Sequence, residues 1–154
     1  MRWSLCFAIL VGMSQSVTIV GAGLAGSEAA LQLADRGVRV RLVEMRPKTP
    51  TLVHVTGCCA ELVCSNSLKS EKPDSAAGML KRELAELGSQ LYAQAKLHAV
   101  PAGGALAVDR TAFAEAVTAL VEAHPLIDLV HEEVVDLVQA AELSLIHISE
   151  PTRH

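Results

Sequence analysis

The order of apolar and polar positions near the start of the chain predicts a strand, a helix and a second strand. Residues 17–20 form a short apolar run closed by a glycine, which is typical of a buried strand. Residues 24–36 are rich in alanine and leucine, and residues 38–44 alternate after the helix-ending Gly37. The expected inward positions are Ala25, Ala29, Ala30 and Leu33 on the helix and Val38, Val40 and Leu42 on the second strand.

Further along, the pattern predicts a long irregular segment, a helix and a short strand. Prolines, glycine, serines and cysteines replace periodic apolar spacing between residues 45 and 73, so we expect a loop with at most a short helical turn. Residues 75–95 recover the helical period, and residues 100–108 form a glycine-containing turn that runs into an apolar strand. The buried stripe of that helix is expected at Leu80, Leu84, Leu87 and Leu91, with Lys81, Arg82, Glu83 and Glu86 largely outside it.

The last periodic part of the chain predicts one more helix and two strands. Asp109 is suited to cap the helix, and His124 with the following proline ends it. Residues 127–130 are then expected as a strand, with residues 134–138 as its partner. The apolar side of the helix consists of Phe113, Val117, Leu120 and Val121.

Both ends of the chain depart from this pattern. Residues 1–12 resemble a short signal peptide, but no cleavage site follows and the apolar run is too short to span a bilayer. We interpret them as a spurious upstream extension of the reading frame, with Met13 as the start and the cytoplasm as the location. Residues 139–154 resemble translated sequencing-adapter sequence, and a natural short strand at 145–148 is the alternative. Residues 13–138 then form the N-terminal part of one domain.

Composition favours an α/β fold. The 154 residues are 51% apolar, which is enough for a core and excludes a disordered chain. Aromatic residues make up only 3%, whereas alanine, valine and leucine are abundant, as in sheets closely covered by helices. The 13 basic and 17 acidic side chains give a net charge of −4, so charge alone predicts no polyanionic partner.

The four cysteines are expected to be free thiols. Three of them lie close together, but no Cys-x-x-Cys pair is present, and His54 does not complete a tetrahedral zinc set. We therefore expect no metal site. The cysteines are Cys6, Cys58, Cys59 and Cys64.

Three glycines between the first strand and the first helix form a dinucleotide-binding fingerprint. Gly21 allows a tight turn, Gly23 lets a pyrophosphate approach the backbone, and Gly26 permits close packing of the helix on the strand. Glu44 closes the second strand, where an acidic side chain binds ribose hydroxyls. The positions between the glycines that are also expected to contact the cofactor, at the positive end of the helix, are Ala22, Leu24 and Ala25.

The fingerprint leaves the choice of dinucleotide open. A carboxylate at position 44 repels a 2′-phosphate, so NADP is disfavoured, while FAD and NAD both remain. A glycine turn that binds no nucleotide, with Glu44 merely exposed, is the alternative.

Four blocks of the sequence together resemble one family. The chain is similar to TrmFO, a family of folate- and FAD-dependent tRNA (uracil-5-)-methyltransferases related to GidA. The resemblance implies a Rossmann-like FAD-binding domain of the glutathione-reductase-like class, present here only as its N-terminal, incomplete part. The blocks are residues 17–30, 44–47, 61–68 and 100–110.

The resemblance also implies a reaction. Methylenetetrahydrofolate supplies a one-carbon unit, reduced FAD supplies electrons, NAD(P)H recharges the flavin, and a uridine in the T-loop of tRNA becomes 5-methyluridine. Gly21, Gly23, Gly26 and Glu44 match the positions that hold FAD in the family, and the backbone near Val134 matches the adenine position.

Cys64 matches a family cysteine that lies near the flavin and takes part in methyl transfer. A thiolate can add to an electrophilic centre when a helix N-terminus or a cation lowers its pKa. The alternative is an inert cysteine. Residues 55–60 depart from the family pattern, so no function is carried over to Cys58 or Cys59.

One other class of function remains open for the parent protein. The parent protein could be another GidA-type FAD-dependent tRNA-modifying protein or a disulfide-reductase-type FAD or NAD oxidoreductase with the same fingerprint. The 154 residues by themselves are expected to form an incomplete, inactive fold that binds nothing tightly, because a half-sheet with open edges lacks a flavin-ring pocket.

Overall fold

The parallel sheet is the base of the structure. We describe a computed structural model over residues 16–135 of the chain. Its sheet has the strand order β1-β2-β6, in which β1 is Ser16–Val20, β2 is Arg39–Glu44 and β6 is Ile127–His131. All three strands run parallel, with Val17 opposite Val40 and Val40 opposite Ile127. This is the strand–helix–strand unit that the sequence predicts, followed by a third strand beside the second.

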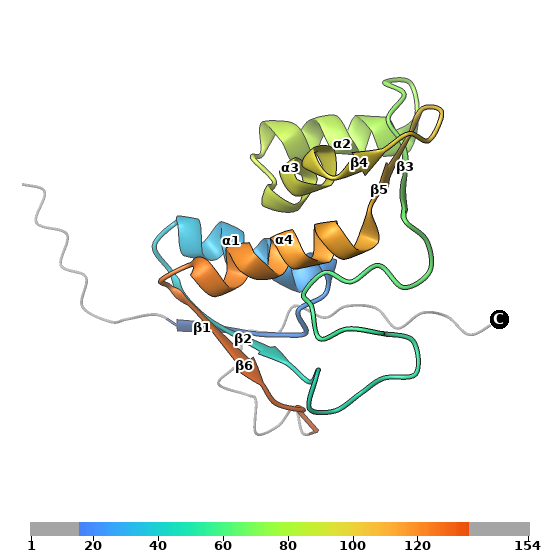
Figure 1. Cartoon of the computed structure of the whole chain (residues 1–154). Coiled ribbons are helices and arrows are strands. Elements are labelled where there is room, and N and C mark those ends of the chain that lie inside the picture. The colour runs from blue at the N-terminus through green and yellow to red at the C-terminus, as the bar shows by residue number, and fades with distance from the viewer. Residues whose placement is uncertain (1–15, 136–154) are drawn as a thin grey trace, which may run out of the picture.

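Two helices cover one face of this sheet (Figure 1). They are α1, Leu24–Asp35, and α4, Arg110–Ala123. The Asp109 side chain accepts hydrogen bonds from two N–H groups at the start of α4, which confirms the predicted cap. Gly37, at φ +82, follows α1 as predicted.

The buried face of α1 differs from the predicted one. Ala30 is buried as expected, but Ala25 is exposed, and Ala29 and Leu33 are only partly buried. The reason is the close approach of Gly26 to the glycine loop, which turns that side of the helix toward the sheet and Ala25 outward. The buried residues of α1 are Gly26, Ser27, Ala30, Leu31 and Ala34.

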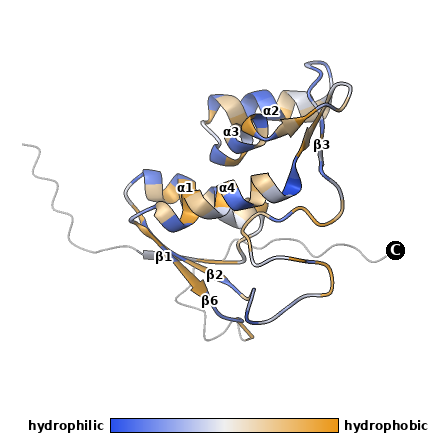
Figure 2. Ribbon diagram, viewed as in Figure 1, coloured by the Kyte–Doolittle hydropathy of each residue, from blue (hydrophilic) through white to orange (hydrophobic). Residues whose placement is uncertain are grey.

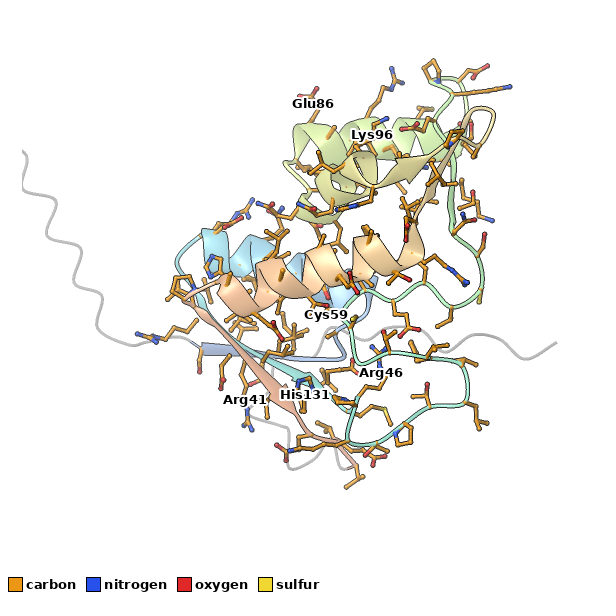
Figure 3. All side chains as sticks on the ribbon, viewed as in Figure 1. Arg41, Arg46, Cys59, Glu86, Lys96 and His131 are labelled. Carbon is orange, nitrogen blue, oxygen red and sulfur yellow. The ribbon has the colours of Figure 1, made fainter. Side chains whose placement is uncertain are left out.

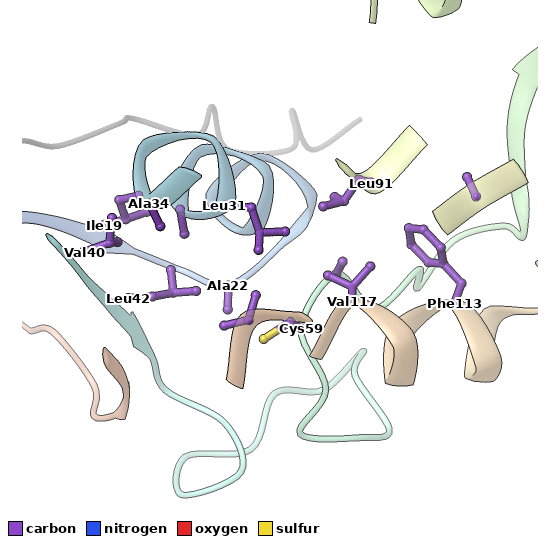
Figure 4. Close-up of a cluster of buried hydrophobic side chains, with 14 of the residues drawn as sticks. Ile19, Ala22, Leu31, Ala34, Val40, Leu42, Cys59, Leu91, Phe113 and Val117 are labelled. Carbon is purple, nitrogen blue, oxygen red and sulfur yellow. The ribbon is translucent and has the colours of Figure 1, made fainter. Parts of the chain in front are cut away.

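The core lies between the sheet and these helices (Figure 4). Ile19 and Leu42 project from the strands, and Val117 and Phe113 of α4 are fully buried. The apolar side predicted for α4 is therefore confirmed at its centre. Hydrophobic residues follow the sheet and the facing sides of the helices (Figure 2).

Two helices stand where the sequence predicts one. Helix α2, Ala76–Glu86, ends before Gly88, which has φ +71, and α3, Gln90–Leu97, starts after its cap Ser89. A glycine in the left-handed region ends a helix readily, and a serine can then cap a new one. The new helix is anchored on α1, because Glu28 accepts hydrogen bonds from the Ser89 hydroxyl and from the N–H groups of Gln90 and Leu91.

The buried stripe predicted across these helices is wrong at two positions. Leu91 is buried and Leu84 half-buried, but Leu80 is 56% and Leu87 70% exposed. Lys81, which was expected outside the stripe, is only 7% exposed, and its ammonium group donates to the carbonyls of Ser70 and Ala77. The break at Gly88 turns α3 away from the direction of α2, so one continuous helical stripe cannot form.

A small antiparallel sheet accompanies α2 and α3. It has the order β3-β5-β4, in which β3 is Ser67–Ser70, β5 is Ala105–Val108 and β4 is Ala99–Val100. The strand at β5 is predicted by the sequence, whereas β3 lies in the segment expected to be irregular. That expectation is wrong for residues 67–70, which form a strand because they pair with β5. The sequence pattern does not reveal this strand, since β3 is polar and bulged, with Lys69 at φ +71. Residues 45–66 are irregular, as predicted.

The end of β6 lies beside the end of β2. The N–H group of Glu132 donates to the Glu44 carbonyl, and Val134 follows without belonging to a strand. Of the partner strand predicted for residues 134–138, positions 136–138 lie outside the described residues. So do the predicted extension 1–12 and the predicted tail 139–154.

Among residues 16–135, no helix combines the length and the apolar character needed to cross a bilayer.

The packing of Gly26 gives a testable prediction about stability. A Cβ atom at Gly26 would lie 1.9 Å from the Gly21 carbonyl oxygen, so Gly26→Ala must displace backbone. We expect it to lower the free energy of unfolding by about 3 kcal/mol, measured by urea denaturation. Gly23→Ala is the matched control, because a Cβ there meets nothing within 4 Å, and we expect a change below about 1 kcal/mol. Equal losses from both substitutions would contradict the close-packing account.

Candidate dinucleotide-binding site

The glycine loop connects the carboxyl end of β1 to the start of α1. Gly21 has φ +94, a conformation that favours glycine, and its N–H group donates to the Val43 carbonyl at 2.7 Å. Gly26 packs against Gly21, while Gly23 has open space where a side chain would stand. These are the three properties that the fingerprint predicts for its glycines.

The first turn of α1 is open toward an anion. Gly23 caps the helix without a side-chain hydrogen bond, and the first turn contains no acidic residue. Within residues 16–135, the N–H groups of Leu24, Ala25 and Gly26 have no acceptor, and Leu24 and Ala25 are exposed. Unpaired N–H groups at the positive end of a helix are suited to bind a phosphate.

Glu44 reaches the glycine loop from the end of β2. Its Oε2 atom accepts the Ala22 N–H at 2.8 Å, and its Oε1 atom accepts the backbone N–H and the Nε–H of Arg46 at 3.0 and 2.8 Å. Burial by itself raises the pKa of Glu44, but the hydrogen bonds from Arg46 and Ala22 outweigh it, and the pKa lies below its ordinary value. Glu44 is therefore a fixed, buried carboxylate beside the open first turn of α1, and not the exposed side chain of the alternative interpretation.

Arg46 joins Glu44 to the long loop. It is 4% exposed, and its second ion pair is with Glu61, at 3.1 Å between Nη1 and Oε2. Glu61 also accepts the N–H groups of Val55 and Thr56 and the Thr56 hydroxyl. Burial raises the pKa of Glu61, but these hydrogen bonds lower it by more, so the pKa lies below its ordinary value. Figure 3 shows Arg46 and His131 toward the same end of the sheet.

Sequence reasoning missed both Arg46 and Glu61. Neither belongs to a periodic pattern, and they occur only within the blocks at residues 44–47 and 61–68. A buried arginine between two carboxylates depends on how the loop folds back, which local spacing does not specify.

Ala22 has a different position from the one its inclusion in the fingerprint suggests. It is fully buried, its N–H group donates to Glu44, and its carbonyl accepts the Ala60 N–H and the Ser27 hydroxyl. The described residues thus use both backbone polar groups of Ala22 to hold the loop together. Direct contact between Ala22 and a cofactor stays a prediction.

Cys64 is exposed in the segment that leads into β3. The guanidinium group of Arg110, at the start of α4, donates to the Leu62 carbonyl at 3.4 Å and so holds a cation beside this segment. The next residues along the chain, Ser65 and Asn66, line an open hollow of about 460 Å³. Its other lining residues are Val100, Val108, Asp109 and Arg110. Cys64 and the glycine loop are joined by no hydrogen bond or ion pair among the described residues, so a shared site stays a prediction.

The other two described cysteines have different surroundings. Cys59 is buried beneath α4, where its N–H group donates to the Thr118 hydroxyl, and burial raises the pKa of its thiol to about 11. A thiol with that pKa is a poor nucleophile near neutral pH. Cys58 is half-buried. The structure brings no three potential metal ligands together anywhere in residues 16–135.

Val134 lies just past the end of β6. The preceding Glu133 accepts the Thr49 hydroxyl, and Glu132 donates to the Glu44 carbonyl, so this segment runs beside the end of β2. The adenine position inferred for Val134 stays a prediction.

Comparison with protein families identifies the chain. The family model described as glucose inhibited division protein A, or GIDA, matches residues 16–152. The chain belongs to this family. A GidA structure from Aquifex aeolicus has the same fold, with a TM-score of 0.62 at 21% identity over 78% of this chain and 20% of that one. The Rossmann-like α/β class with FAD-binding topology is therefore confirmed.

Curated relatives within the family are more similar still. A protein from Magnetococcus marinus is 58% identical over 120 residues, which is 77% of this chain and 27% of the relative. One from Symbiobacterium thermophilum is 58% identical over 118 residues, which is 77% of this chain and 26% of the relative. Both are named methylenetetrahydrofolate–tRNA-(uracil-5-)-methyltransferase TrmFO, which confirms the resemblance found in the sequence. The matched part of this chain spans about a quarter of the length of these relatives.

The lowered carboxylate pKa values predict a loss of stability in acid. A lowered pKa in the folded state gives stability that is fully present above the ordinary value of 4.5 and is lost as the pH falls through the lowered value. We expect the free energy of unfolding, measured in urea, to fall between pH 7 and pH ~3.5. Glu61→Gln should make this fall smaller.

Glu132→Gln is the control for this experiment. Glu132 pairs with Arg41 at the surface, where both side chains are at least half exposed, so its removal should leave the pH dependence unchanged. A pH dependence that is the same in Glu61→Gln as in the unsubstituted chain would show that the Glu61 carboxylate contributes nothing.

Proposed function

We propose that the chain forms the adenosine-binding part of the FAD site in a methylenetetrahydrofolate- and FAD-dependent tRNA (uracil-5-)-methyltransferase. The observation that carries the proposal is the pairing of an open α1 N-terminus with the fixed carboxylate of Glu44. The similarity to the methyltransferase relatives supports the choice of reaction.

The residues of the loop fit FAD. The pyrophosphate would accept the N–H groups of Leu24, Ala25 and Gly26, and the open space at Gly23 allows it to approach the backbone. The ribose hydroxyls would donate to Glu44, which also repels the 2′-phosphate of NADP. The adenine would lie against the segment that includes Val134.

Cys64 is the proposed catalytic residue. When bound, FAD supplies the reducing electrons for methyl transfer, and NAD(P)H restores them. The exposed Cys64 thiol, on a segment bound by Arg110, would add to an electrophilic carbon or exchange a proton during alkylation of the uracil. Methylenetetrahydrofolate would be the one-carbon donor, and a uridine in the T-loop of a cytoplasmic tRNA would become 5-methyluridine.

A second candidate is another FAD-dependent tRNA-modifying protein of the GidA type. The observation in its favour is that the matching family model is that of GidA itself. Methyl transfer to uracil distinguishes the two.

A chimeric enzyme tests the proposal. The 120 matched residues of the Magnetococcus marinus relative would be replaced by those of this chain, which are 58% identical. We expect the purified chimera to form 5-methyluridine in a tRNA transcript when given methylenetetrahydrofolate, FAD and NADPH. Cys64→Ala in the chimera should lower the rate at least ~100-fold, because the thiol takes part in the chemistry.

Cys58→Ser is the matched control, because Cys58 lies in the same loop but has no proposed function. We expect its rate to stay within about threefold of the chimera's. A chimera that binds FAD but makes no 5-methyluridine would refute the reaction, and a normal rate in Cys64→Ala would refute the role of Cys64.

A further inference from the structure

A buried arginine lies behind the carboxylate that the proposed site presents to the ribose. Arg46 is 4% exposed and contacts Glu44 on one side and Glu61 on the other. A charge this deeply buried is retained only where its partners compensate the loss of water. The surroundings of Arg46 therefore show what it does.

We propose that Arg46 is a positioning residue that determines which oxygen of Glu44 accepts a ribose hydroxyl. The inference rests on the proposed function of Glu44 and adds a residue that the fingerprint does not contain. Arg46 does not itself contact the nucleotide in this account.

The hydrogen bonds of Glu44 carry the argument. A carboxylate oxygen accepts about two hydrogen bonds in the plane of the group. Oε1 already has two donors, the backbone N–H and the Nε–H of Arg46. Oε2 has one donor, the Ala22 N–H at 2.8 Å, so it alone retains room for a further donor. A ribose hydroxyl that binds beside Ala22 could therefore donate a second hydrogen bond to Oε2.

Arg46 is itself held by three contacts besides those with Glu44. Its carbonyl contacts Nδ1 of His131, at the end of β6, at 2.5 Å. Its Nη1 group donates to Glu61 at 3.1 Å and to the Thr56 carbonyl at 3.4 Å. The guanidinium therefore cannot follow a rotation of Glu44, and the orientation of the carboxylate is fixed before any ligand arrives.

Lysine would not reproduce this arrangement. The Nε and Nη1 groups of Arg46 face two different carboxylates at once, whereas a lysine ammonium is a single centre that can approach only one of them closely. We therefore expect a conservative replacement to restore the charge but not the full orientation.

The experiment compares two nucleotides that differ in one ribose hydroxyl. ADP and 2′-deoxy-ADP are titrated into the 154-residue chain, and affinities are measured from backbone amide chemical shifts. We expect the unsubstituted chain to prefer ADP by about tenfold, because the deoxy nucleotide cannot donate the additional hydrogen bond to Oε2 of Glu44. Arg46→Met should lower this preference to about twofold or less, and Arg46→Lys should give an intermediate value.

Arg41→Met is the matched control. Arg41 stands on the same strand, β2, and pairs with Glu132 at the surface, so its removal should leave the tenfold preference intact. A general loss of stability lowers the affinity for both nucleotides equally, and only a change in orientation alters the ratio. The amide spectrum shows whether each variant is folded. If Arg46→Met is unfolded, Arg46→Lys carries the test.

The outcomes separate the inference from the function on which it rests. If the unsubstituted chain binds neither nucleotide, the titrations are repeated with the chimera, in which the rest of the enzyme is present. Failure of the chimera to bind either nucleotide would overturn the proposed function and the inference with it. Binding with the ADP preference unchanged in Arg46→Met and Arg46→Lys would overturn the inference alone. A reduced preference in both, with the preference kept in Arg41→Met, would support it.

Discussion

The contact between Gly26 and the Gly21 carbonyl is the constraint on which the site depends. Because Gly26 has no Cβ atom, α1 can begin directly above the end of β1, where a Cβ would collide with the Gly21 carbonyl oxygen. This closeness aims the N–H groups of Leu24 and Ala25 at the carboxyl edge of the sheet. The same edge carries Glu44, since neighbouring parallel strands end together. One backbone approach therefore brings together the open first turn of α1 and the Glu44 carboxylate, the two parts of the proposed site.

The second organising feature is the chain of charges from Glu44 through Arg46 to Glu61. It runs from the glycine loop into the irregular residues 45–66, and the Ala60 N–H adds a bond back to Ala22. This loop has no helix or strand whose backbone hydrogen bonds could hold it, and the buried ion pairs hold it in their place. Removing one member leaves another charge buried without a partner, which is costly. The loop that leads to Cys64 is in this way tied to the proposed nucleotide site.

The sequence was informative wherever neighbouring residues determine the structure. The strand–glycine–helix unit, the cap at Asp109 and the apolar side of α4 follow from local spacing, and all are present. Tertiary contacts decided the rest. Strand β3 exists because β5 pairs with it, Lys81 is buried because two carbonyls accept hydrogen bonds from its ammonium group, and Arg46 is buried because the loop folds back over it. None of these contacts leaves a periodic trace in the chain.

The most direct measurement of the central claim is a map of amide chemical shifts when ADP is added to the chain. We expect the largest shifts on Leu24, Ala25 and Gly26, whose N–H groups have no acceptor among residues 16–135. Gly23→Val should abolish these shifts while the rest of the spectrum is preserved, because a side chain there would fill the space through which the phosphate approaches. Shifts centred elsewhere, or shifts that survive Gly23→Val, would contradict the account.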